Sequence, residues 1–106
     1  MATPEGKIKD KVKQIFKTYE TLYYEMPVPS GYGKSGLDFT ACFCGRFFAI
    51  ETKAPGKTLT ALQMQTMHSI VRAGGVVFVV HGEDGLQHLD AWLLVTYAMW
   101  HSESKL

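Results

Sequence analysis

Two runs of strand-forming residues with only two residues between them constrain the fold most strongly. Residues 37–43 and residues 46–53 are rich in aromatic and small side chains, and Cys44 and Gly45 separate them. Two strands joined by so short a connection form a tight antiparallel hairpin. We therefore predict a tight hairpin over these residues.

The register of this hairpin decides which side chains share a face. With a two-residue turn, Asp38 stands opposite Glu51, whereas a turn of three or four residues would break this pairing. Side chains alternate between the two faces along each strand. The core face then holds Phe39, Ala41, Phe43, Phe48 and Ile50, and the opposite face holds Asp38, Thr40, Cys42, Phe47, Ala49, Glu51 and Lys53.

The rest of the chain predicts further helices and strands on both sides of the hairpin. Hydrophobic spacing, capping residues and glycine breaks indicate these elements. Before the hairpin we expect a helix that begins at Thr3-Pro4, a strand over 22–26 and a loop over 27–36. After it we expect a helix from Thr58 or Thr60 to about Ala73, a strand over 76–80, a polar turn over 81–85 and a helix from Leu86 to about residue 101. The apolar run 76–80 is typical of a strand buried on both faces. The order α-β-β-β-α-β-α predicts an α/β fold whose mixed sheet is antiparallel at the hairpin and parallel across the β-α-β connection.

Length and composition restrict the class of protein. A chain of 106 residues favours one domain over 1–106. It has neither the apolar stretch of a membrane span nor a secretory signal, so we expect a cytoplasmic protein with no membrane partner. Its two cysteines, Cys42 and Cys44, cannot build a four-ligand zinc site, and we interpret them as reduced thiols in the core.

The net charge of +1 conceals an asymmetry along the chain. Residues 1–80 hold ten Lys and Arg against six Asp and Glu, whereas residues 81–106 hold one Lys against four Asp and Glu. A basic region permits a polyanionic partner such as a nucleic acid, although solvated surface lysines are the commoner explanation.

Asp38, Glu51 and Lys53 form the candidate chemical site. Directly opposed residues of a hairpin have Cβ atoms about 5 Å apart, and like charges there are destabilising unless a cation lies between them. Carboxylate oxygens favour Mg²⁺ or Mn²⁺, and a lysine one pleat further could orient a water or neutralise charge on a phosphate. The alternative is a solvated sheet face with ordinary surface charges.

An ordered set of motifs resembles the PD-(D/E)XK nuclease superfamily and, within it, the small stand-alone VRR-NUC domains of phages. The set, over a core of about residues 4–81, comprises Gly36-x-Asp38, Ile50-Glu51-Thr52-Lys53, Pro55-Gly56-Lys57, Thr60, Gln63 and Ala73-Gly74-Gly75. The resemblance implies a restriction-endonuclease-like αβββαβ core with an extra C-terminal helix at about 86–101. The sequence departs from the pattern in one place, because Leu37 stands where the motif has its proline.

The resemblance also implies roles for particular residues. Asp38, Glu51, the Thr52 carbonyl and an acid of the first helix would bind Mg²⁺, which Mn²⁺ could replace. For that acid we favour Glu5, with Glu20 as the substitute. Lys53 would be the catalytic lysine, and Gln63 would support the site; both join Asp38 and Glu51 in the expected catalytic set. The loop residues Lys34, Ser35 and Lys57 could bind DNA phosphates.

The expected activity is that of a Mg²⁺-dependent endodeoxyribonuclease, with DNA as partner and no small-molecule cofactor. The alternative is a non-catalytic nucleic-acid-binding or assembly module that retains the fold. Resemblance favours branched DNA such as four-way junctions, and a phage-encoded protein would act in the host cytoplasm. The C-terminal helix is apolar on more than one side, which predicts a homodimer; its apolar residues are Leu86, Leu89, Ala91, Trp92, Leu93, Val95, Tyr97, Ala98, Met99 and Trp100.

Overall fold

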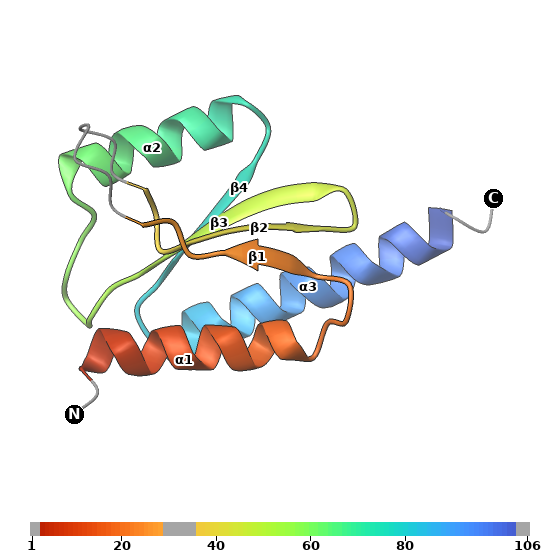
Figure 1. Cartoon of the computed structure of the whole chain (residues 1–106), viewed down its shortest axis with the longest axis horizontal. Helices are drawn as coiled ribbons and strands as arrows, with labels where there is room; N and C mark the ends of the chain where they lie inside the picture. Colours follow the sequence, from red (N-terminus) through yellow and green to blue (C-terminus); the bar gives the residue numbers. More distant parts are fainter. Residues whose placement is uncertain (1–2, 29–35, 104–106) are drawn as a thin grey trace.

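The computed structural model describes residues 3–28 and 36–103. Its elements are α1 (Pro4–Lys17), β1 (Tyr23–Glu25), β2 (Phe39–Phe43), β3 (Arg46–Thr52), α2 (Ala61–Arg72), β4 (Val76–Val80) and α3 (Glu83–Glu103), as Figure 1 shows. The predicted order of elements and the α/β class are confirmed. Thr3 caps α1 through its side chain and Pro4 occupies the first turn, as the sequence indicates.

The four strands form one mixed sheet in the order β1-β2-β3-β4. The β1/β2 and β2/β3 pairs are antiparallel, and β3/β4 is parallel. Cys44 and Gly45 form the predicted two-residue turn, with φ angles of 52° and 74°, the combination that a type I′ hairpin requires. The register runs from Phe43 opposite Arg46 to Phe39 opposite Ile50, as predicted.

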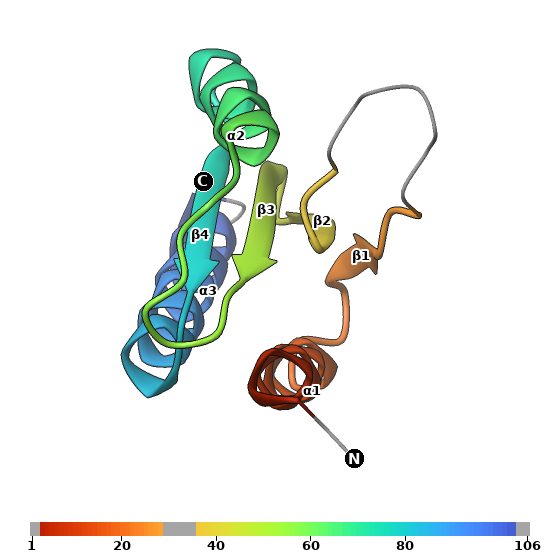
Figure 2. The ribbon, with the colours of Figure 1, turned by 90° about the vertical axis from the view of Figure 1, so that its left-hand side faces the viewer.

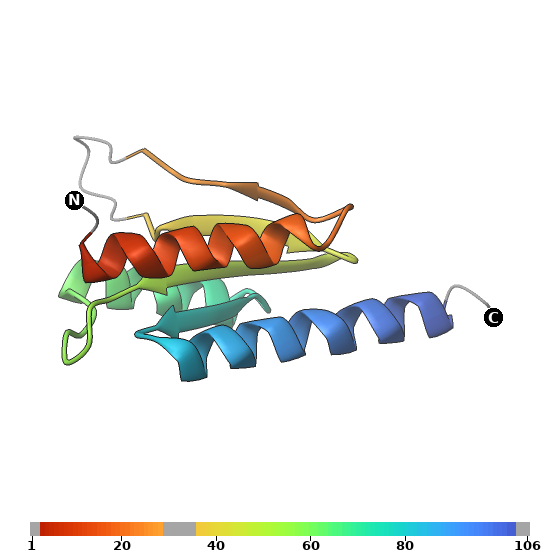
Figure 3. The same ribbon diagram turned by 90° about the horizontal axis from the view of Figure 1, so that it is seen from below.

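Helices cover both faces of the sheet (Figure 2). On one face α1 and α3 lie side by side (Figure 3), and the Tyr19 hydroxyl after α1 donates a 2.7 Å hydrogen bond to Asp90 Oδ1 on α3. The predicted core face of the hairpin packs beneath them, and its five residues are each at most 3% exposed. Helix α2 lies across the other face (Figure 2). The main core comprises Ile8, Val12, Phe16, Phe39, Ala41, Phe43, Phe48, Ile50, Val80, Leu86, Leu89 and Leu93.

The interpretation of the cysteines as core thiols is wrong for Cys42, whereas Cys44 packs against the edge of the core. Cys42 is exposed and Cys44 is only partly buried. Cys42 lies on the α2 side of the sheet opposite Phe47, which is itself 46% exposed, because this end of the hairpin extends beyond the cover of α2. Cys44 lies in the turn, and its left-handed backbone takes it out of the strand alternation.

Two other expectations need correction. Four of the five residues of β4 are partly exposed and only Val80 is buried, because β4 is an edge strand. The polar turn predicted for 81–85 is shorter, since α3 already begins at Glu83. Gly85 fits inside this helix because a Cβ there would lie 3.1 Å from Val80 Cα, so a side chain would disturb the helix–strand contact.

Candidate active site

Four segments that are separate in sequence meet at one end of the sheet. Asp38 immediately precedes β2, and Glu51 lies near the end of β3. Glu5 lies in the first turn of α1, and Gln63 in the first turn of α2. These segments lie toward the left of Figure 1, where both helices begin.

Three carboxylates gather at this meeting point. Glu5, Asp38 and Glu51 each offer an oxygen, and these three atoms lie within 4.8 Å of one another. Glu51 is buried at 2% exposure, whereas Glu5 and Asp38 are partly exposed. The structure thus brings Glu5 to the two hairpin acids. Glu20 lies beyond the end of α1 and shares a pocket with the hairpin turn instead.

Hydrogen bonds orient the two hairpin carboxylates. Thr52 donates to Asp38 Oδ2 through its backbone nitrogen at 2.8 Å and through its hydroxyl at 2.6 Å. The Asp38 backbone nitrogen donates to Glu51 Oε1 at 3.0 Å. Gln63 Nε2 donates to Glu51 Oε2, also at 3.0 Å. Asp38 Oδ2 and both oxygens of Glu51 therefore have defined donors, so both carboxylates are held in place.

Gln63 links the site to the start of α2. Its Oε1 accepts a 3.0 Å hydrogen bond from the Thr60 backbone nitrogen, and the Thr60 hydroxyl accepts one from the Gln63 backbone nitrogen. This reciprocal pair is a capping box. Because Oε1 accepts the hydrogen bond from Thr60, the orientation of the side-chain amide is fixed. Its Nε2 group therefore faces Glu51.

Each hairpin carboxylate also has its own lysine. Lys53 Nζ lies 3.4 Å from Glu51 Oε2, and its side chain is 14% exposed. Lys9 Nζ, from α1, lies 3.4 Å from Asp38 Oδ1. Two ammonium groups therefore stand among three carboxylates.

The pKa of Glu51 is raised above its ordinary value. Burial is the largest cause, and the negative charge of Asp38 adds to it. The positive charge of Lys53 and the hydrogen bonds from Asp38 and Lys53 oppose the rise in pKa without cancelling it. The site therefore favours a cation that can offset the charge of a buried carboxylate.

The donor set fits a small divalent cation. Mg²⁺ binds oxygen at about 2.1 Å, so two of its ligand atoms lie at most about 4.2 Å apart. The three carboxylate oxygens are within 4.8 Å of one another, and a small adjustment of the side chains would close the difference. Oxygen-only ligands are those that Mg²⁺ and Mn²⁺ prefer.

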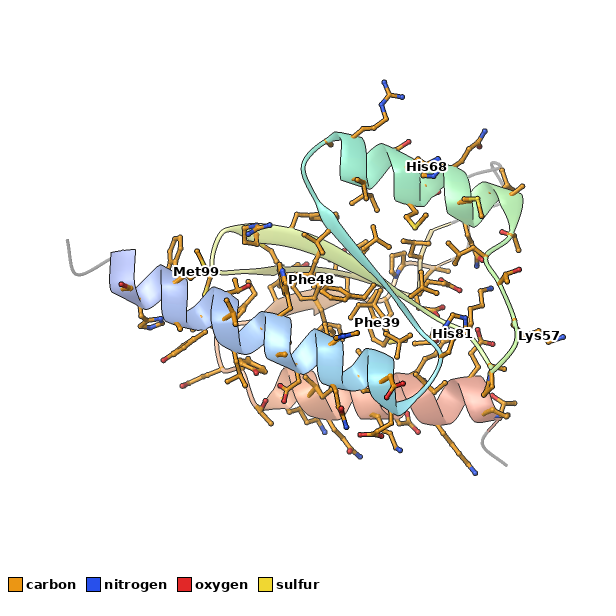
Figure 4. All side chains as sticks on the ribbon, turned by 180° about the vertical axis from the view of Figure 1, so that it is seen from behind. Phe39, Phe48, Lys57, His68, His81 and Met99 are labelled. Atoms are coloured by element: carbon orange, nitrogen blue, oxygen red, sulfur yellow. The ribbon has the colours of Figure 1, made fainter. Side chains whose placement is uncertain are left out.

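Of the three predicted DNA contacts, the structure describes only Lys57. Lys57 is exposed on the loop between β3 and α2, and Figure 4 shows its side chain directed away from the protein. The Lys57 carbonyl oxygen lies 2.8 Å from His81 Nε2, at the end of β4, so the loop is tied to the sheet. Lys34 and Ser35 lie outside the described residues.

Sequence reasoning missed two contributors to the site. Lys9 follows Glu5 by four residues, so both lie on one side of α1; this spacing was the available signal. The Thr52 hydroxyl had no comparable signal in the sequence. Its hydrogen bond to Asp38 depends on how the end of β3 lies beside the start of β2.

Comparison with known proteins supports the assignment of the fold. No protein-family model matches the sequence, and a search of curated proteins found no match. Among solved structures, a VRR_NUC domain is similar, with a TM-score of 0.71 and 22% sequence identity. The likeness covers 83% of this chain and 95% of that chain. The chain thus has the VRR-NUC fold, and the predicted α/β fold with its mixed sheet is confirmed.

Proposed function

We propose that the chain is a divalent-metal-dependent nuclease that hydrolyses phosphodiester bonds in DNA, with Mg²⁺ as the ion and Mn²⁺ able to replace it. One observation carries the proposal: three carboxylate oxygens within 4.8 Å of one another, beside a lysine that is ion-paired to one of them. The fold agrees, because the similar solved structure is a VRR_NUC domain. A binding site for DNA alone would gain nothing from carboxylates that face a phosphate.

Some side chains of the site would bind the ion, and others would act on the water or the phosphate. Glu5, Asp38, Glu51 and the Thr52 carbonyl would hold the ion. When bound, the ion supplies Lewis-acid polarisation of the phosphate and a nucleophilic water. Lys53 would orient that water or neutralise the charge that develops on the phosphate. Gln63 acts through Glu51 and is therefore a positioning residue.

The finer features of the proposal concern the substrate and the assembly. Lys57, Lys34 and Ser35 would contact DNA phosphates near the site. The protein would be a homodimer that prefers branched DNA such as four-way junctions, because two sites related by a two-fold axis suit the cutting of two strands. The apolar side chains exposed on α3 support the dimer, with Leu94, Val95, Tyr97, Met99 and Trp100 each 45% to 58% exposed.

A panel of labelled DNAs tests the activity. Four-way junctions, linear duplexes and single strands are incubated with Mg²⁺, Mn²⁺, Ca²⁺ or EDTA. We expect cleavage with Mg²⁺ and Mn²⁺, binding without cleavage with Ca²⁺, and no cleavage with EDTA. Full activity in EDTA would contradict a metal mechanism. Binding without cleavage under every condition would instead support the non-catalytic alternative, and equal cleavage of duplex and junction would contradict the substrate preference.

A further inference from the structure

The four residues after Lys53 form a closed turn. They are Ala54, Pro55, Gly56 and Lys57, and the Lys57 backbone nitrogen donates a 3.0 Å hydrogen bond to the Ala54 carbonyl oxygen. Proline at the second position and a glycine with a φ of 81° at the third are typical of a type II turn. Because proline also fixes its own φ, the turn loses little conformational freedom on forming. The Lys57 backbone therefore has a defined place relative to Lys53.

Two consecutive residues at the end of β4 hold this turn on both sides. The Val80 carbonyl oxygen accepts a 3.0 Å hydrogen bond from the Lys53 backbone nitrogen, just before the turn. His81 Nε2 lies 2.8 Å from the Lys57 carbonyl oxygen, at the end of the turn. A carbonyl oxygen only accepts, so Nε2 carries the hydrogen. The second of these contacts is made by a side chain, so substitution can remove it without changing the first.

The two lysines on either side of the turn face different surroundings. Lys53 lies 3.4 Å from Glu51 Oε2, and its side chain is 14% exposed. Lys57 is exposed, its side chain is directed away from the protein (Figure 4), and no ion pair involves it within residues 3–28 and 36–103. Its ammonium group is thus available to a DNA phosphate. Such a contact costs less ordering when the backbone that carries the lysine is already held.

We infer that His81 is a positioning residue for DNA binding: it holds the turn through the Lys57 carbonyl oxygen, so that Lys57 meets a phosphate next to the one that is cleaved. The inference rests on the proposed nuclease function and deepens it. The imidazole need not touch the DNA, because its effect passes through the turn. Since Lys53 has its own hydrogen bond to Val80, His81 contributes to DNA affinity and not to the rate of the cleavage step.

DNA affinity in Ca²⁺ and the cleavage rate of saturated DNA in Mg²⁺ separate these two effects. His81→Leu removes the donor, whereas His81→Gln keeps an N–H group near the place of Nε2. We expect His81→Leu to weaken DNA binding about two- to ten-fold and His81→Gln to bind as the wild type does. Both should cleave saturated DNA at the wild-type rate. The matched control is His68→Leu, which should bind as the wild type does, because His68 is exposed on α2 and lies away from the turn (Figure 4).

Combination with Lys57→Met distinguishes positioning from a general structural role. If His81 acts through Lys57, His81→Leu has no further effect on DNA affinity in the Lys57→Met protein. Gly56→Ala probes the same turn independently, because a Cβ at Gly56 meets no atom within 4 Å and only its positive φ causes strain. We expect Gly56→Ala to weaken DNA binding as His81→Leu does, and likewise to have no further effect beside Lys57→Met.

Three results would overturn the role of His81. They are a DNA affinity of His81→Leu equal to that of His68→Leu, an equal loss of affinity in His81→Gln and His81→Leu, or losses that add when His81→Leu is combined with Lys57→Met. If one of them occurs while the wild type binds and cleaves DNA, only this inference fails. A wild type that neither binds DNA in Ca²⁺ nor cleaves it in Mg²⁺ overturns the proposed function itself.

Discussion

At the scale of single residues, the site depends on the two hairpin carboxylates, which accept hydrogen bonds from specific donors. Glu51 illustrates the consequence, because Oε1 accepts from Asp38 while Oε2 accepts from Gln63 and faces Lys53. A glutamine at position 51 would have one acceptor oxygen where Glu51 has two. Its amide NH₂ group would then face either the Asp38 N–H or the donors of Gln63 and Lys53. Loss of activity in Glu51→Gln would therefore report misorientation as well as lost charge, so substitutions at Gln63 and Lys53 are cleaner probes.

Gln63→Glu separates the two tasks of Gln63. The new carboxylate can still accept from the Thr60 backbone nitrogen, so the capping box is retained. It cannot donate to Glu51 and places a like charge beside it. We expect cleavage to fall at least about ten-fold while the melting temperature changes little. The control is Gln65→Glu, an exposed position on the same helix; equal activity of the two variants would show that Gln63 does not support the site.

The raised pKa of Glu51 predicts the pH dependence of metal binding. The cation requires the ionised carboxylate, and protonation competes with it. Because the folded pKa lies above that of an ordinary glutamate, Ca²⁺ affinity should be highest at neutral to alkaline pH. It should decline on acidification before an ordinary glutamate would titrate. Calorimetric titration with Ca²⁺ from pH 8 to pH 5 measures this decline, and a constant affinity over that range would contradict the assignment of Glu51 as a ligand.

At the scale of elements, the hairpin turn sets the distance between the acids, since the β2/β3 register places Asp38 beside Glu51. Both turn residues have positive φ, and in Gly45 a Cβ would also lie 3.3 Å from the Trp100 ring. We expect Gly45→Ala to destabilise the protein by about 1–2 kcal/mol. Cys44→Asn should be stabilising, because Asn-Gly suits this turn. Thermal unfolding compares the melting temperatures of the two variants with that of the wild type. If both variants shifted the melting temperature in the same direction, the turn would not control the hairpin register.

The elements also show how far the sequence alone predicts this protein. The two-residue turn and strand alternation were sufficient for the hairpin register, and Thr3 for the start of α1. For α2 the sequence left Thr58 and Thr60 open as caps, and the structure shows Thr60. The exposure of Cys42 could not be predicted, because it depends on how far α2 extends over the sheet. The contact between Lys9 and Asp38 depends on the docking of α1 against the sheet, which one-dimensional periodicity does not describe.

At the scale of the whole molecule, α3 extends beyond the sheet. The helix has 21 residues, and Figure 1 shows its C-terminal end projecting past the β2/β3 hairpin. The radius of gyration is 14.2 Å, against about 13 Å for a compact domain of this length. No helix within the described residues is both long and apolar enough to cross a membrane.

The C-terminal half of α3 is where we expect the dimer interface. Val95 and Met99 are 57% and 58% exposed and lie one turn apart. Light scattering at micromolar concentration should give twice the chain mass of 11.9 kDa, and Val95→Glu with Met99→Glu should give the monomer. Gln87→Glu, exposed nearer the start of α3, should remain dimeric. A monomeric wild type would contradict the dimer.

The central claim is that Lys53, held beside Glu51, serves phosphodiester hydrolysis. Its most direct test is the Mg²⁺-dependent cleavage rate of Lys53→Met beside Lys7→Met, on the DNA that the wild type cleaves best. We predict that Lys53→Met loses about 10²–10⁴-fold in rate, keeps its DNA affinity in Ca²⁺ within a few-fold, and remains folded. Lys7→Met should cleave at the wild-type rate. Cleavage by Lys53→Met at the rate of Lys7→Met would contradict the assignment of the site.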